Sequence, residues 1–363
     1  MKPARPTVVY REGRRTTLAG LIRWVKSCAG GFLLGGLALA TDLPAAEVDG
    51  SFALTAGTSI RFASVEQGRE VLGRRDAFIT ALSPWDRQAR LRTDRDVSSE
   101  EFLAFVTGEV LAWEPEERTR LAAVLEQVRE RLRPWPLRLP REILFVLTTG
   151  REEGGAAYCR EQTIVLPRPL LGARGPDKTQ TGPRLERLVL HELFHILSAH
   201  DRALRDRLYR SIGFTRCGEV ALPEDVAARR ITNPDAPIVE HAIEIELEGK
   251  PVSVVPILLA DAPRYPATGG RVFFRHLQFR LLVVEPRRDG GVAPRLVQGA
   301  PQWVDPGAAP GYHEKIGRNT DYIIHPEEVL ADNFALLLLG NGQVNSPHVL
   351  DGMRRILLEN EAR

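Results

Sequence analysis

The sequence predicts an α+β protein, in which a helical N-terminal region is followed by a domain that combines a small sheet with helices. Two observations indicate this class. Apolar residues recur at three- and four-residue steps between Ser64 and about Arg133, which is the period of helices that bury one face. After a proline cluster at 134–136, short apolar runs typical of strands alternate with helical segments, and residues 238–285 have the texture of strands.

Composition narrows the class of protein. The chain has 363 residues, 43% of them hydrophobic and 26% charged, which excludes disordered, collagen-like and coiled-coil proteins. Lys and Arg number 49 and Asp and Glu 47, for a net charge of +2. Residues 1–40 hold seven basic residues and one acidic residue, so the remainder carries −4. We therefore expect no nucleic-acid partner.

Residues 1–40 resemble a secretory signal peptide. A basic stretch precedes the uncharged run from Ser27 to Ala40, whose apolar core of about a dozen residues is shorter than the ~20 that span a bilayer. The sequence Ala38-Leu39-Ala40 predicts cleavage before Thr41. We expect an exported bacterial protein, periplasmic or extracellular, with no membrane span in the mature chain. An uncleaved N-terminal anchor and a misplaced start residue are the alternatives.

Export would leave two cysteines, Cys159 and Cys217. In an oxidising compartment they could pair as a disulfide, and the alternative is two buried free thiols. Neither lies in a CxxC pair, so we do not expect a cysteine zinc site.

The helical N-terminal region is expected to span 41–136. Residues 51–63 are expected to form a short extended segment before the helices. Ser98, followed three residues later by Glu101, is typical of a capped helix start. A charged amphipathic helix is predicted from Pro115 to Arg133, with proline at its first position. The proline cluster at 134–136 then marks the domain boundary.

The second domain, 137–363, is expected to mix short strands, helices and a β-rich insertion at about 238–303. The predicted strands are 143–148, 158–159 and 163–166. The predicted helices are 183–199, 201–212, 326–339 and 347–359. The segment 233–237 is rich in turn-forming residues, and we expect no catalytic role for it.

The segment Leu188–Leu197 contains His191, Glu192 and His195 in an otherwise apolar helix. Histidines four residues apart lie one turn apart on one helix face, where they can occupy two corners of a tetrahedral zinc ion. Glu192 would lie beside the open corner as the general base. A buried helix must satisfy its polar side chains, and a metal does so for both imidazoles at once. The alternative is a helix whose histidines are merely hydrogen-bonded.

A third ligand must come from elsewhere in the chain. His200 lies nine residues after His191, half a turn out of phase, and is excluded. A helix beginning at Pro326 offers Glu328 as ligand, with Asp332 on the same face to accept the other ring N–H of His191. Glu327 lacks such a partner at the fourth position and is expected only to complement the helix dipole.

These two motifs together resemble the gluzincin metallopeptidases, the thermolysin-like clan. The stretch from Glu328 to Phe334 is similar to the third-ligand helix of the anthrax lethal factor-like branch. The resemblance implies a zincin-like metallopeptidase domain and a tyrosine, here Tyr322, that stabilises the transition state. The alternatives for that donor are His241, Tyr312, His313 and His325. His195 and Glu328 are 133 positions apart, far more than in thermolysin. Either residues 238–303 are an insertion, or the substrate cleft is built differently.

The function expected from this pattern is a secreted zinc endopeptidase that acts on a protein or peptide. Zinc lowers the pKa of its bound water towards ~7, and Glu192 accepts the proton and later delivers it to the leaving amine. Two other functions fit the same residues: a catalytically inert zinc-binding module, and a zinc amidase acting on a cell-wall linkage.

Overall fold

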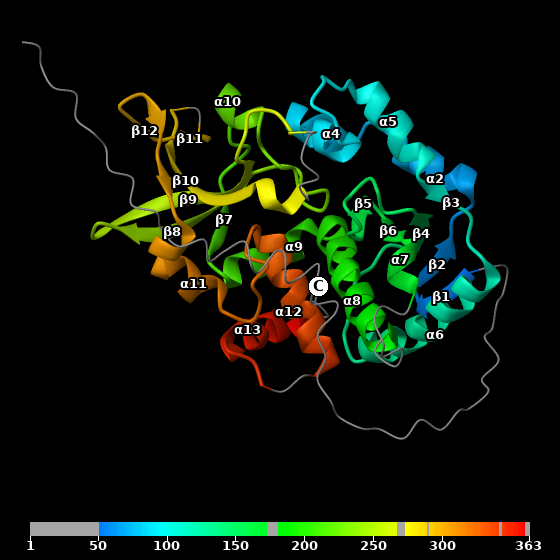
Figure 1. Cartoon of the computed structure of the whole chain (residues 1–363). Helices are drawn as coiled ribbons and strands as arrows, with labels where there is room; N and C mark the ends of the chain where they lie inside the picture. Colours follow the sequence, from blue (N-terminus) through cyan, green and yellow to red (C-terminus); the bar gives the residue numbers. More distant parts are fainter. Residues whose placement is uncertain (1–50, 173–180, 267–272, 289, 341–342, 360–363) are drawn as a thin grey trace, which may run out of the picture.

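The computed structural model describes residues 51–172, 181–266, 273–288, 290–340 and 343–359. The expected signal peptide, 1–40, lies outside the described residues. Two six-stranded sheets flank a group of long helices, the first on the right and the second at the upper left of Figure 1. One hydrophobic core runs from the first sheet through these helices to the second sheet. The chain is therefore a mixed α+β fold, as the sequence predicts.

The first sheet has the strand order β1-β2-β4-β6-β5, and β3 pairs with the end of β4. Its strands are β1 (Ser51–Thr55), β2 (Thr58–Phe62), β3 (Val110–Leu111), β4 (Glu142–Thr148), β5 (Tyr158–Arg160) and β6 (Thr163–Pro167). β2 and β6 run parallel to β4, whereas β1, β3 and β5 pair antiparallel with their neighbours. β5 is the last strand at one edge of this sheet.

Strands β1 and β2 lie in the expected extended segment 51–63, and β3 is an additional short strand between the helices of the N-terminal region. β2 pairs with β4 from Ser59↔Glu142 to Phe62↔Phe145, so the sheet contains strands from both sides of the proline cluster. Residues 51–63 alone give no sign of a partner strand 83 residues away, and β3 has only two residues. The N-terminal region and the rest of the chain thus share one sheet.

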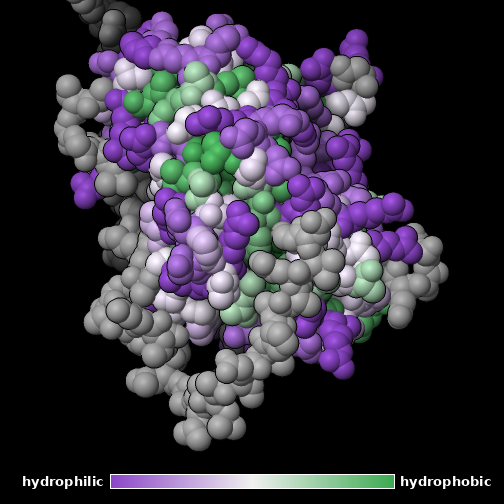
Figure 2. Space-filling model, turned by 90° about the vertical axis from the view of Figure 1, so that its right-hand side faces the viewer, coloured by the Kyte–Doolittle hydropathy of each residue, from purple (hydrophilic) through white to green (hydrophobic). Residues whose placement is uncertain are grey.

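The helices of the N-terminal region follow the predicted pattern. They are α2 (Val65–Leu72), α3 (Ala77–Ala81), α4 (Pro84–Leu91), α5 (Ser99–Gly108) and α6 (Pro115–Leu132). The Ser98 hydroxyl accepts a hydrogen bond from the backbone N–H of Glu101, as the capping pattern predicts. α6 begins at Pro115 and packs against β1 and α8, which links this region to the long central helix. On the face that α2 and α5 border, hydrophobic residues gather in patches framed by hydrophilic ones (Figure 2).

The second sheet is antiparallel and has the order β11-β10-β9-β8-β7, with β14 paired to β10. Its strands are β7 (Phe214–Arg216), β8 (His241–Leu247), β9 (Lys250–Ala260), β10 (Leu277–Pro286), β11 (Val292–Pro294) and β14 (Trp303–Val304), while β12 (Leu296–Val297) and β13 (Ala300–Pro301) form a separate pair. Apart from β7, these strands fall within the β-rich region expected from the sequence.

The remaining helices include the two that carry the candidate ligands. They are α7 (Arg168–Leu171), α8 (Thr181–His200), α9 (Arg202–Ser211), α10 (Glu224–Ala227), α11 (Pro310–Ile316), α12 (Pro326–Leu339) and α13 (Pro347–Leu358), with short 3₁₀ turns η2 (Phe273–His276) and η3 (Pro306–Ala308). α8 and α12 pack against each other, and the rings of Phe194 and Phe334 lie 5.6 Å apart between them. Among the described residues, none of the helices combines the length and apolar character that crossing a membrane requires.

Both described cysteines are free thiols, so the disulfide alternative is not realised. Cys159 is buried in β5 of the first sheet, whereas Cys217 is half-buried directly after β7 of the second. The two residues thus belong to different sheets.

Glu152 is fully buried, accepts a hydrogen bond from the Thr148 hydroxyl (2.5 Å), and has a second carboxylate oxygen with no hydrogen-bond partner among the described residues. Burial raises its pKa from 4.5 to about 7. The folded state therefore favours the protonated carboxyl. The resulting stabilisation is complete below pH 4.5 and is lost as the pH rises through 7.

We expect the free energy of unfolding to fall by about 3 kcal/mol across this pH window, as measured by urea titration. Glu152→Gln should flatten the dependence, since an amide does not ionise. Glu116→Gln, at an exposed position of α6, should keep the wild-type slope. A steep slope that persists in Glu152→Gln would assign the pH dependence to another group.

Candidate metal centre

Helix α8 places His191 and His195 one turn apart and buries both, with 3% of each exposed. The two imidazole rings are nearly perpendicular, at 83°, and their centroids lie 4.8 Å apart. The helix is buried from Leu188 to Ser198 and packs within the core, so the histidine pair is held on a rigid element. His200, at the C-terminal end of α8, is exposed, in agreement with its exclusion as a ligand.

Helix α12 brings a carboxylate to this pair. The helix begins at Pro326, and the His325 side chain caps it by accepting a hydrogen bond from the Glu327 N–H (3.1 Å). Glu328 Oε2 lies 3.3 Å from His191 Nε2 and 3.7 Å from His195 Nε2. The three side chains predicted as ligands thus meet at one point, although α8 and α12 are far apart in the sequence.

The other ring nitrogen of each histidine faces a carboxylate. His191 Nδ1 lies 3.2 Å from Asp332 Oδ1, the contact that the spacing of Glu328 and Asp332 predicts. His195 Nδ1 lies 2.9 Å from Glu327 Oε1. A proton on each Nδ1 would satisfy these carboxylates and leave both Nε2 lone pairs directed at Glu328.

Glu327 therefore corrects the expectation that it only complements the helix dipole. Besides its contact with His195, its Oε2 accepts hydrogen bonds from the Ser198 hydroxyl (2.7 Å) and from the Tyr209 hydroxyl. The search for a partner four residues further along the same helix could not reveal this contact, because Glu327 projects towards His195 on α8. Asp332 is held in a similar way by the Thr320 hydroxyl.

The geometry fits a tetrahedral zinc ion. At zinc–ligand distances of about 2.0–2.1 Å, adjacent ligand atoms lie about 3.3–3.4 Å apart. The Nε2–Oε2 separations of 3.3 and 3.7 Å are close to this value, and the three ligand atoms all lie within 4.8 Å of one another. Two imidazoles and one carboxylate also form the ligand set that leaves a fourth position open for chemistry.

The charges around the imidazoles favour a cation. Five carboxylates gather here, from Glu192, Asp235, Glu327, Glu328 and Asp332. Burial disfavours charge on His191, but hydrogen bonds to Asp332 and Glu328 outweigh burial and raise its pKa to about 9. The pKa of His195 also lies well above its usual value, because Asp235, Glu328 and Glu327 together outweigh burial. A divalent cation would take the place of these protons.

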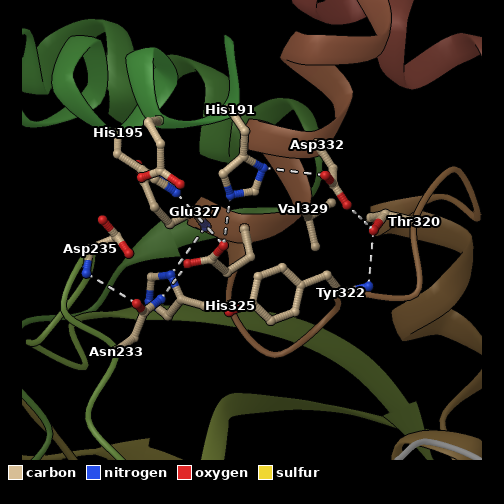
Figure 3. Close-up of polar contacts among 12 residues, drawn as sticks. His191, His195, Asn233, Asp235, Thr320, Tyr322, His325, Glu327, Val329 and Asp332 are labelled. Carbon is tan, nitrogen blue, oxygen red and sulfur yellow. Dashed lines mark hydrogen bonds and ion pairs between the residues drawn. The ribbon is translucent and has the colours of Figure 1, made fainter. Parts of the chain in front are cut away.

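Glu192 and Tyr322 both line the pocket in front of the ligands. Burial raises the pKa of Glu192, one of whose carboxylate oxygens lies 3.4 Å from the Cys159 sulfur. The Tyr322 ring stacks on His191, with 20° between planes and 6.5 Å between centroids. Its backbone N–H donates to Thr320 (2.9 Å), which ties Tyr322 to the residue that holds Asp332 (Figure 3).

Besides forming the expected turn, the segment 233–237 reaches the site. The turn is present, since Asp235 N–H donates to Asn233 Oδ1 (3.1 Å). Asn233 Nδ2 also donates to Glu328 Oε1 (2.7 Å), and Asp235 Oδ1 accepts from the Cys159 backbone N–H (2.7 Å). No local pattern reveals contacts to residues some 75–95 positions away.

The alternative oxyanion donors have other roles or positions. The Tyr312 hydroxyl donates to the Ile323 carbonyl (2.7 Å), and His241 Nε2 lies 3.3 Å from Asp206. Neither Tyr312 nor His313 is among the residues that line the pocket. His325 lines it, but its Nδ1 already caps α12.

Comparison of the chain with protein-family models, curated proteins and solved structures finds no match. The chemistry of the centre is therefore inferred from its own residues.

Truncation of Glu327 should weaken zinc binding. We expect Glu327→Ala to lower zinc affinity about 10–100-fold in a chelator-competition titration, because His195 loses the acceptor that orients its ring. Glu116→Ala removes an exposed glutamate from the same first-turn position of α6, where no histidine of the described residues is in contact, and should bind zinc as the wild type does. Equal zinc affinity in both variants would indicate that Glu327 only complements the dipole of α12.

Proposed function

We propose that this protein is a zinc-dependent endopeptidase. The observation that supports the proposal most is the convergence of His191 Nε2, His195 Nε2 and Glu328 Oε2, with Glu192 beside them in the same pocket. A purely structural histidine pair does not require a glutamate of this kind facing a cavity. This arrangement is also the one that the resemblance to the gluzincins implies.

Zinc, when bound, acts as a Lewis acid that lowers the pKa of a coordinated water and polarises a carbonyl oxygen. Glu192 accepts a proton from the attacking water and passes it to the leaving amine. Burial raises the pKa of this carboxyl, which strengthens it as a proton acceptor.

Tyr322 is our candidate for the donor to the developing oxyanion. Its ring lies against His191, and its backbone is tied through Thr320 to Asp332, so its position is set by the same groups that orient the ligand. Burial raises the pKa of its hydroxyl well above the usual value, which keeps the phenol protonated as a donor.

A protein or peptide is the proposed substrate, and the periplasm or cell exterior the proposed location. The pocket wall beyond the ligands is largely apolar, including Ile231, Leu258 and Phe273, and can accept side chains as well as backbone. The proposed export rests on the signal-like sequence of residues 1–40 alone.

The central test is Glu192→Gln. We expect the purified protein to bind one zinc ion tightly and to cleave members of a peptide library, and the variant to keep the zinc but lose hydrolysis. Glu186→Gln is the matched control, since Glu186 lies on α8 but pairs with Arg131 outside the pocket. Undiminished turnover in Glu192→Gln would exclude the mechanism.

The same assay separates the other two functions. Cleavage of cell-wall muropeptides but not of the peptide library would indicate an amidase. Zinc binding without turnover of either substrate would indicate an inert module.

Tyr322→Phe should lower kcat by about 10²–10³ while zinc content and KM stay near wild type, because only the transition state uses the hydroxyl. Tyr312→Phe removes a buried hydroxyl outside the pocket and should leave kcat unchanged. Steady-state kinetics on one library-derived peptide measures both. A kcat unaffected in Tyr322→Phe would assign the donor to another residue.

A further inference from the structure

A second group of potential metal ligands lies next to the first. The Cys159 sulfur and one carboxylate oxygen each from Glu192 and Asp235 lie within 4.8 Å of one another. The three residues come from β5, from α8 and from the segment 233–237, so three separate parts of the chain converge. Only Glu192 belongs to the catalytic arrangement proposed above.

The separations suit a metal. Cys159 Sγ lies 3.4 Å from Glu192 Oε2. A thiolate at about 2.3 Å and a carboxylate at about 2.0 Å from a tetrahedral zinc ion lie about 3.5 Å apart. Asp235 is fixed by the hydrogen bond from the Cys159 backbone N–H (2.7 Å), so its position relative to the sulfur is set by the main chain.

The charges of the group are poorly compensated. Glu192 is buried and Asp235 is half-buried, and one carboxylate oxygen of each lies within 4.8 Å of the other, so two acidic groups repel each other here. His195 offsets part of this charge, but its own ring is committed to Glu327 and Glu328. A cation held between the two carboxylates would lower the cost of burying them.

We propose that Cys159, Glu192 and Asp235 form a second cation site, selective for zinc or cadmium, whose occupation removes Glu192 from the reaction. The thiolate favours these ions over magnesium and calcium. Cys159 and Asp235 both line a second cavity, and Asp235 also lines the catalytic pocket, which gives an ion a route to the site. The inhibitory consequence rests on the proposed peptidase function, whereas metal binding does not.

Cadmium titration of the full chain tests the binding directly. We expect the wild type to take up two cadmium ions and to develop the ultraviolet cadmium–thiolate absorption. His191→Ala/His195→Ala should bind one ion and keep the absorption, whereas Cys159→Ser should bind one ion and lose it. Asp235→Asn, which keeps the thiol, should weaken the thiolate-linked ion at least tenfold.

The other cysteines provide the controls. Cys28→Ser and Cys217→Ser should each retain both ions and the absorption. Absorption that survives in Cys159→Ser, or that disappears in either control, would overturn the site, as would uptake of a single ion by the wild type.

The inhibitory role has its own readout. Excess zinc should inhibit wild-type peptide hydrolysis, and Cys159→Ser should require at least tenfold more zinc for half-inhibition. Equal zinc sensitivity would refute the inhibition. If no variant hydrolyses peptides, the proposed function fails, and the cadmium titration still decides whether the second site exists.

Discussion

The contact between Glu328 and the two Nε2 atoms of His191 and His195 is the constraint on which the rest of the centre depends. It requires α8 and α12, whose candidate ligands His195 and Glu328 are 133 positions apart in sequence, to keep a fixed distance and rotation. Aromatic packing between Phe194 and Phe334 sets the separation of the helices. The carboxylates of Glu327 and Asp332 then fix the rotation of each imidazole, so ligand orientation is built into the interface of the two helices.

The cost of this arrangement is electrostatic. Burying several carboxylates is unfavourable unless each has a hydrogen-bond donor or a cation nearby. The chain supplies donors from many elements: Ser198 and Tyr209 for Glu327, Thr320 for Asp332 and Asn233 for Glu328. The backbone of β5 supplies one more, for Asp235. Such donors reduce the penalty without removing the negative charge, and a metal ion bound by His191, His195 and Glu328 would compensate the remaining charge.

Sequence periodicity predicted the parts of the centre that are local. Sequence spacing predicts which side chains lie one turn apart on one helix face. This holds for His191 and His195 and for Glu328 and Asp332. The contacts of Glu327 and of the segment 233–237 cross between elements, so no spacing rule reveals them. The same limit applies to the fold. Helix starts such as Ser98 and Pro115 are encoded locally, whereas the pairing of β2 with β4 depends on chain topology.

The hydrogen bond from the Cys159 N–H to Asp235 has a consequence for the behaviour of the protein in concentrated solution. β5 is the last strand of its sheet, and an unpaired N–H on such a strand invites pairing with a strand of a neighbouring molecule. A side-chain carboxylate that occupies this donor makes the edge a poor template for intermolecular association. The segment 233–237 thus occupies one outward backbone donor of an edge strand whose residues are all buried.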